Sequence, residues 1–170
     1  MQYWRWLIPG VLVVVLGVLQ ASLVPELRVY SATPHLTLLF VVGWSLLAGL
    51  PWSLPWAFAA GLLLDLASGS PLGLNALALL PVALMAGAAE GNALRGNLAL
   101  PVIAAGAGVI VYYLFLVVEQ ETLGYGAAWL SILVYVVVPS AVLNAVIMPP
   151  FYWLLSWIHR GTHPRTRAEW

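Results

Sequence analysis

The chain has 170 residues, of which 63% are apolar and only 7% are charged. Soluble domains are about half apolar and about a quarter charged, so this chain has too few charges to cover its apolar residues with a soluble surface. Its net charge of zero argues against a nucleic-acid surface, and a sequence without cysteine excludes disulfides and thiolate chemistry. Composition therefore predicts an integral membrane protein.

Six apolar stretches follow one another along the chain, most of them close to the roughly 17 to 25 residues that a spanning helix needs. The first could be a signal peptide, but it lacks a small-residue cleavage site, so we interpret it as a retained helix. The predicted spans are residues 6–24, 36–50, 54–67, 72–89, 98–118 and 129–148, the last continuing over 151–158. We expect one all-α polytopic membrane domain, residues 1–170, built as a bundle of about six transmembrane helices.

Three breaks between these spans depend on proline or polar residues. Residues 51–55, Pro-Trp-Ser-Leu-Pro, should separate the second span from the third, and polar residues 119–122 should end the fifth. Pro149 and Pro150 should interrupt the last span, because proline lacks a backbone N–H and clashes with the preceding turn. Pro139, with Ser140 and Asn144, should kink it.

Arginine placement predicts the orientation. With six spans, both termini lie on one side of the membrane. That side carries Arg5, Arg95, Arg160, Arg165 and Arg167, and the other side carries only Arg28. Positively charged loops stay in the cytoplasm, so both termini should be cytoplasmic. We expect the basic tail to contact anionic lipid of the bilayer, with a cytoplasmic partner as the alternative.

Asp65 is a carboxylate inside a long apolar tract, which makes it a functional-site hypothesis by default. A Ser-Gly-Ser-Pro turn follows, in which Pro71 at a first helical position and Ser70 as N-cap predict the start of the next helix. Asp65 and Asn75 are each five residues from Ser70, so they should lie at similar depth in an antiparallel hairpin. We hypothesise one hydrogen-bonded cluster of Asp65, Ser68, Ser70 and Asn75. We favour a structural role for it, locking the hairpin, over a ligand or proton role.

Small residues recur four apart, a spacing that lets helices approach closely in lipid. The sets are Gly69 with Gly73; Ala83 with Gly87 and Gly91; and Ala104 with Gly108. We interpret them as internal packing, with contact to a partner's helix as the alternative. His35, before the second span, is expected to be interfacial. The sequence lacks H-E-x-x-H, G-x-S-x-G and Walker A motifs, so we predict no catalytic, cofactor-binding or metal-binding residues.

The pattern Gly61-x3-Asp65-x3-Gly69-x-Pro71-Leu72-Gly73-x2-Ala76-Leu77 resembles the central signature of the rod shape-determining protein MreD family. Length, span number and the basic C-terminal tail are also similar to that family. Many members have Pro-Asp-Leu or Pro-Asn-Leu at the start of the second span, where this chain has Pro34-His35-Leu36. The candidate structural or partner-interaction residues are Gly61, Asp65, Ser68, Gly69, Ser70, Pro71, Gly73 and Asn75.

The resemblance implies a non-enzymatic, multi-pass subunit of the bacterial elongation machinery in the cytoplasmic (inner) membrane. Its partners would be the single-span MreC, the glycosyltransferase RodA with its transpeptidase, and indirectly the MreB filament. Together these insert peptidoglycan and maintain rod shape. The family is also thought to be distantly similar in fold to the substrate-binding subunits of energy-coupling-factor (ECF) transporters.

Two functions therefore stay open at this point. A scaffold would dock MreC's single helix against the bundle and relay its state to the synthase pair. A transporter subunit would instead bind a small, vitamin-type solute from outside. Against the second, the outer loops offer few hydrogen-bonding groups, and Gly17-x3-Ala21 is only a weak match to the Ala-x3-Ala coupling motif expected in the first helix.

Overall fold

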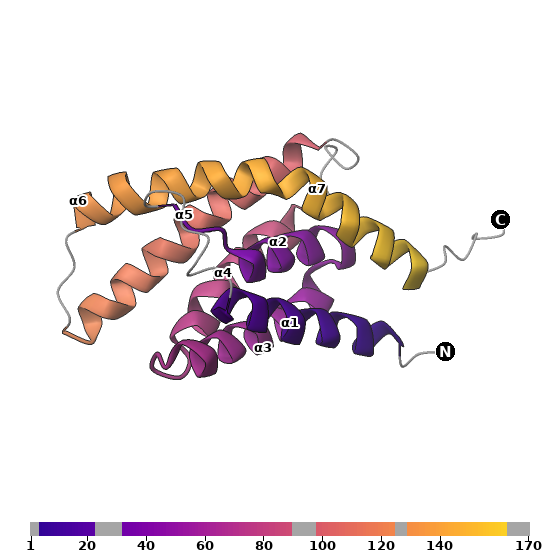
Figure 1. Cartoon of the computed structure of the whole chain (residues 1–170), viewed down its shortest axis with the longest axis horizontal. Helices are drawn as coiled ribbons and strands as arrows, with labels where there is room; N and C mark the ends of the chain where they lie inside the picture. Colours follow the sequence, from indigo (N-terminus) through magenta and orange to yellow (C-terminus); the bar gives the residue numbers. More distant parts are fainter. Residues whose placement is uncertain (1–3, 23–31, 90–97, 125–128, 163–170) are drawn as a thin grey trace.

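The computed structural model describes residues 4–22, 32–89, 98–124 and 129–162, whose regular elements are helices (Figure 1). In chain order these are α1 Trp4–Ser22, α2 Leu36–Ala48, α3 Leu50–Ser68, α4 Leu74–Ala88, α5 Ala99–Thr122, α6 Trp129–Ile132, the π-helical turn η2 Leu133–Val137, and α7 Val138–Thr162. The all-helical fold class is therefore confirmed, and the arrangement is compatible with a membrane helical bundle.

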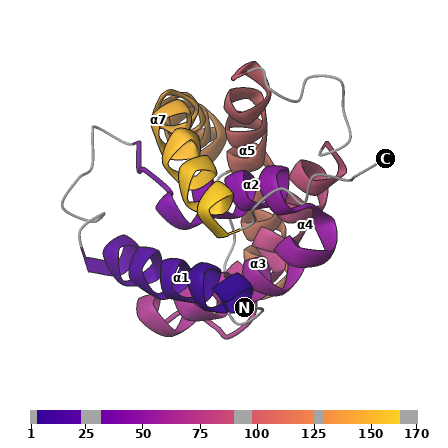
Figure 2. The same ribbon diagram turned by 90° about the vertical axis from the view of Figure 1, so that its right-hand side faces the viewer.

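Helix α2 lies at the centre of the bundle and contacts α1, α3, α4, α5 and α7, as an end-on view shows (Figure 2). Residues 37–46 are all buried, so α2 is enclosed on every side rather than on one stripe. Such a helix must be apolar all round, which its sequence is, apart from Thr37 and Ser45. α2 is therefore the core element against which the other helices pack.

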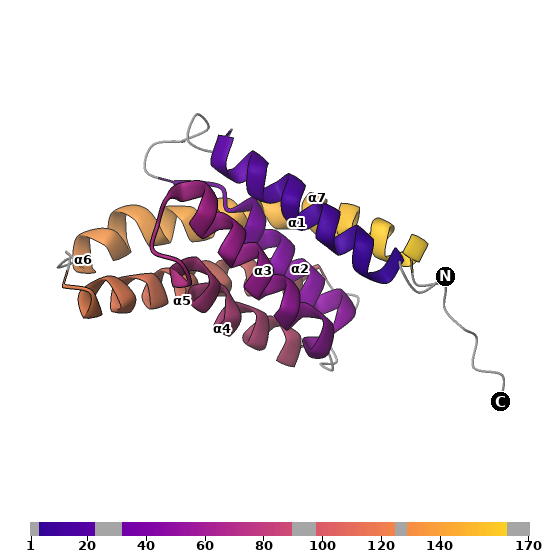
Figure 3. The same cartoon turned by 90° about the horizontal axis from the view of Figure 1, so that it is seen from below.

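Helices α3 and α4 form a tight antiparallel hairpin beside α2, and α1 lies along α3 (Figure 3). α5 and α7 form a second pair, and with α6 they extend beyond the other helices at the left of Figure 1. In this arrangement the hairpin reaches the second pair mainly through α5, which packs against α4.

Three described helices are long and apolar enough to cross a membrane: Leu50–Ser68, Ala99–Thr122 and Leu133–Gly161. Three shorter apolar helices accompany them: Trp6–Ser22, Leu36–Ala48 and Leu74–Ala88. Six apolar helical stretches are thus present within the described residues, while the number of true spans stays a prediction.

Two of the expected breaks are wrong, because both proline-containing segments lie within helices. α3 begins at Leu50, directly after Gly49, so the break predicted at residues 51–55 is helical. Pro51 lies in the first turn, where a missing N–H costs no intrahelical hydrogen bond. α7 also continues through Pro149 and Pro150 without a break.

Two further boundaries differ. α5 extends to Thr122, so residues 119–122 belong to the helix and not to a separating loop. α4 begins at Leu74, with Gly73 rather than Ser70 at the N-cap position. Pro71 therefore lies in the turn and not in the first helical position.

The predicted disturbance around Pro139 takes the form of a π-helical turn. η2, Leu133–Val137, ends two residues before Pro139, which cannot donate a backbone hydrogen bond to the preceding turn. Insertion of one extra residue into the turn is a common way in which a helix accommodates such a defect, and π-helical turns occur frequently at functional sites.

Candidate functional site

Asp65 is 1% exposed near the end of α3, and its carboxylate accepts four hydrogen bonds. Oδ1 accepts from the Ser70 hydroxyl at 3.0 Å, from the Asn75 backbone N–H at 2.9 Å and from the Asn75 side-chain amide at 2.8 Å. Oδ2 accepts from the Gly73 N–H at 2.8 Å. All four donors belong to the turn or to the first turn of α4, so the carboxylate closes the hairpin.

The first turn of α4 explains why a carboxylate is stable here. The N–H groups at a helix N-terminus have no partner within their own helix and carry a partial positive charge. Asp65 satisfies the N–H groups of Gly73 and Asn75, the N-cap residue and the second helical residue. The carboxylate therefore lies at the positive end of α4.

The hydroxyls of Ser68 and Ser70 extend this set. They lie 3.0 Å apart, and Ser68 also donates to the carbonyl of Leu64 at 2.7 Å. We call Asp65, Ser68, Ser70, Gly73 and Asn75 the hairpin cluster. The hydrogen-bonded cluster predicted from the sequence is thus present, with the Gly73 N–H as an additional donor.

Gly61 lies one turn before Asp65 and faces the same helix. A Cβ at Gly61 would overlap backbone atoms of Asn75 and Ala76. Only glycine permits this approach, and the approach brings the start of α4 within reach of the Asp65 carboxylate. The spacing Gly61-x3-Asp65 therefore places a contact residue and an acceptor on one face of α3.

The small-residue sets divide between two roles. Gly87 lies against Leu50 and Gly108 against Val42 and Val82, as internal packing requires. Gly69 and Gly73 do not pack: a Cβ on either would meet nothing within 4 Å. Their roles are conformational, since φ is +67° at Gly69 and +101° at Gly73. The packing interpretation of that pair is wrong, and Gly91 lies outside the described residues.

We expect Gly69→Ala to destabilise the protein by about 1 kcal/mol, because a left-handed backbone is unfavourable for alanine. Gly69→Asn should cost less, since asparagine adopts this conformation more readily. The space around Gly69 is open, so the difference isolates backbone strain. Thermal unfolding in mild detergent measures it, with Gly161→Ala, another open site, as the control. Equal melting temperatures for Gly69→Ala and Gly69→Asn would contradict this account.

Tyr112 of α5, which was not predicted from the sequence, contacts the hairpin cluster. Its hydroxyl donates to Asn75 Oδ1, and its side chain is buried. Asn75 thus donates to Asp65 with its amide nitrogen and accepts from Tyr112 with its oxygen. A buried tyrosine hydroxyl needs a partner, but nothing in the local sequence indicates which one.

A second polar cluster connects α7 to the segment before α2. Asn144 is fully buried; its Oδ1 accepts from the His35 N–H at 2.8 Å, and its amide nitrogen donates to the Thr33 carbonyl at 3.1 Å. The Ser140 hydroxyl accepts from the Thr33 N–H at 3.3 Å. We call Ser140 and Asn144 the α7 clamp on residues 33–35. Gln20 of α1 holds the same segment through Pro34 and Leu36.

The His35 ring packs against two tyrosines of α5, and the residue is half-buried, so the interfacial position expected for it stays a prediction. Its centroid lies 5.4 Å from the ring centroids of both Tyr112 and Tyr113. Nε2 lies 2.8 Å from the Tyr113 hydroxyl and 3.2 Å from Thr33 Oγ1. The α7 clamp holds the backbone of His35, and Tyr113 supplies a polar partner for its ring.

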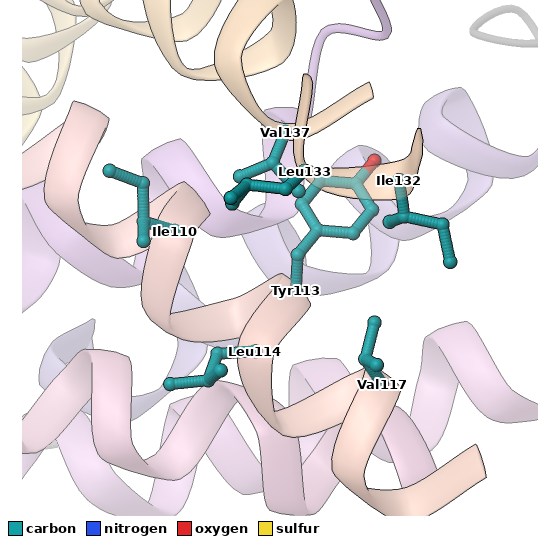
Figure 4. Close-up of a pocket in the computed structure, with 7 residues that line it drawn as sticks. All are labelled: Ile110, Tyr113, Leu114, Val117, Ile132, Leu133 and Val137. Carbon is teal, nitrogen blue, oxygen red and sulfur yellow. The ribbon is translucent and has the colours of Figure 1, made fainter. Parts of the chain in front are cut away.

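Two cavities in the described part of the chain have apolar walls. One, of about 280 Å³, lies between α5 and η2 (Figure 4). Its lining consists of Ile110, Tyr113, Leu114, Val117, Ile132, Leu133 and Val137. A more open groove of about 560 Å³ runs between α1 and α3, lined by residues such as Gly10, Val14 and Ala59. Such walls suit hydrocarbon chains or apolar side chains.

Within the described residues, no group of three or more His, Asp or Glu side chains is placed to hold a metal ion. Asp65, Asn75 and Asn144 are hydrogen-bonded inside the bundle, although a few buried polar atoms, such as the Trp44 indole nitrogen, have no partner among the described residues. Apolar side chains such as Val11, Leu114 and Val146 are exposed. Apolar outside and hydrogen-bonded inside is the pattern of helical membrane proteins. The fold and the site are therefore those expected of a helical membrane protein.

The particular family follows from comparison with known proteins. A model of the rod shape-determining protein MreD family matches residues 2–158, so this chain belongs to that family. It is thus a rod shape-determining membrane protein, of a family not known for enzymes. The resemblance seen in the hairpin signature is confirmed. No curated protein and no solved structure matches the chain, so the expected likeness to ECF transporter subunits stays a prediction.

Proposed function

We propose that this chain is a non-enzymatic scaffold of the rod complex, spanning the cytoplasmic membrane six times as one domain with both termini inside. Its partners would be the transmembrane helix of MreC, RodA with its transpeptidase and, indirectly, MreB. The observation that carries the scaffold role is the saturation of Asp65 by four donors from its own chain. A carboxylate so occupied suits a structural lock and leaves little capacity for a solute.

The groove between α1 and α3 is our candidate for the docking place of MreC's helix. Small residues such as Gly10 and Ala59 lie in its wall, and small residues allow close helix approach in lipid. In the described residues α1 contacts mainly α2 and α3, so its other face, including Val11 and Val14, is exposed. No observation favours the transporter alternative.

Cysteine cross-linking tests this docking place cleanly, because the chain contains no cysteine of its own. We expect Val11→Cys and Val14→Cys, in the groove, to cross-link to cysteines placed in MreC's transmembrane helix. Val142→Cys and Val146→Cys, equally exposed on α7, are the matched controls and should not cross-link. Cross-links confined to α7 would move the interface to that helix, and their absence from all four positions would contradict direct docking of MreC.

A further inference from the structure

Two neighbouring tyrosines of α5 each reach a different polar cluster. The Tyr112 hydroxyl donates to Asn75 in the hairpin cluster, whereas the Tyr113 hydroxyl lies 2.8 Å from Nε2 of His35, in the segment held by the α7 clamp. Successive side chains on an α-helix point about 100° apart, so consecutive residues can serve two sides of α5. The two clusters thus approach one another at a single point of the bundle.

The His35 ring completes the contact at that point. His35 packs against both tyrosines, with centroid distances of 5.4 Å, and the two tyrosine rings lie 5.5 Å apart in an edge-to-face arrangement. We call these three side chains the aromatic junction. Because each ring touches the other two, none can move without displacing its neighbours, which is how close-packed interiors transmit strain.

The π-helical turn lies against the same junction. Leu133 and Val137 of η2 line the apolar cleft together with Tyr113 (Figure 4). Ser140 and Asn144, which hold residues 33–35, follow η2 along the same continuous helix. A change in the register of η2 would therefore act on His35 through the α7 clamp and would reshape the cavity that η2 shares with Tyr113.

We propose that the hairpin cluster, the aromatic junction and the α7 clamp form one coupled network, which links the closure of the α3–α4 hairpin to the position of α7 at its π-helical turn. Buried polar groups have no water to replace a lost partner, so a bond broken at one end shifts the balance at the other. The coupling is a property of this chain alone and does not depend on which partner the scaffold binds.

Backbone hydrogen exchange of the full-length protein in lipid nanodiscs tests the coupling. The His35 amide reports on the α7 clamp, and the Gly73 and Asn75 amides report on the hairpin cluster. Asn144→Ala removes the Asn144 contacts of the clamp, including the acceptor of the His35 N–H, so exchange at His35 must rise directly. Coupling predicts that exchange at Gly73 and Asn75 also rises, by about fivefold or more.

Tyr112→Phe removes only the hydroxyl that joins α5 to Asn75. With this change in place, adding Asn144→Ala should no longer alter exchange at Gly73. Ser156→Ala is the matched control, because Ser156 is buried in α7 but donates to Trp153 of its own helix. It should leave the hairpin amides unchanged.

Exchange that rises at His35 but not at Gly73 or Asn75 would show that the clusters are independent and would overturn the proposal. Should Asn144→Ala prevent folding, Ser140→Ala removes the weaker contact of the clamp, and the Thr33 amide is then its direct reporter. The same criterion applies: a change confined to residues 33–35 overturns the coupling, and a change that reaches the hairpin supports it.

Discussion

Replacing Gly61 with alanine is expected to open the α3–α4 hairpin, although the substitution adds a single methyl group. The new Cβ would overlap backbone atoms of Asn75 and Ala76, which cannot move aside by rotating a side chain. The two helices must separate instead. Overpacking of a core typically costs about 1–3 kcal/mol, and a backbone obstacle belongs at the upper end of that range.

Separation of the two helices would also weaken the hydrogen bonds of the hairpin cluster. Asp65 lies one turn further along the same face of α3, and its bonds to the start of α4 are 2.8–2.9 Å long. An outward shift of α4 would break several of them together. We therefore expect a total loss of about 3 kcal/mol or more for Gly61→Ala, with each buried donor left unpaired adding about 1–3 kcal/mol.

Gly106→Ala is the matched control for this experiment. Gly106 lies in helix α5, where a Cβ would meet its nearest neighbours at 3.9 Å, an ordinary van der Waals contact. Alanine favours a helix over glycine by about 1 kcal/mol, so this variant should be neutral or more stable. Thermal unfolding of both variants in mild detergent gives the comparison. A Gly61→Ala melting temperature equal to that of the wild type would contradict the close approach.

The hairpin cluster could be predicted from the sequence because all its members lie within eleven residues. A short turn fixes the relative depth of Asp65 and Asn75 through chain geometry alone. The family signature pointed to the same stretch. Ser70 shows the limit of that reasoning. Its residue type predicted an N-cap, but the N–H groups at the start of α4 donate to Asp65 of α3 instead.

The α7 clamp could not be predicted, because Asn144 and His35 are 109 residues apart in the sequence. No local pattern indicates which backbone groups a buried asparagine will satisfy. The central position of α2 in the bundle could not be predicted from the sequence either. In a membrane protein, helices that face lipid and helices that are enclosed are both apolar, so hydropathy does not separate α1 from α2. Only the packing of the whole chain decides between them.

Replacing Asp65 with leucine should have the largest effect among single side chains of the hairpin. Leucine removes the acceptor of the two backbone N–H groups and the carboxylate contacts of the Ser70 hydroxyl and the Asn75 amide. The Ser68 and Ser70 oxygens remain as weaker alternatives for the latter two donors. Asn75 is buried, whereas Ser70 and Gly73 are half-buried, so the largest cost falls on the Asn75 donors. Each buried donor left unpaired costs about 1–3 kcal/mol. We expect a total loss of about 3 kcal/mol or more, and loss of MreC on co-purification if the hairpin supports the scaffold.

Asp65→Asn separates the charge from the hydrogen bonds. The amide oxygen can replace Oδ1, which accepts three of the four bonds, but the amide nitrogen would then face the Gly73 N–H, donor against donor. We therefore expect a smaller loss, of about 1–2 kcal/mol. Thermal unfolding and co-purification with MreC are measured on the same samples, with Glu119→Gln, an isosteric change at another carboxylate, as the control.

The relative stability and activity of the two variants distinguish a structural role of Asp65 from a role of its negative charge. A structural lock predicts graded damage, with Asp65→Leu far worse than Asp65→Asn and MreC binding falling in step with stability. A role for the negative charge itself predicts that Asp65→Asn keeps most of the stability yet abolishes complementation of rod shape in cells. The four donors around the carboxylate favour the structural lock, with graded damage in the two variants. A stable Asp65→Asn protein that fails to maintain cell shape would show that the hydrogen bonds alone do not explain this residue.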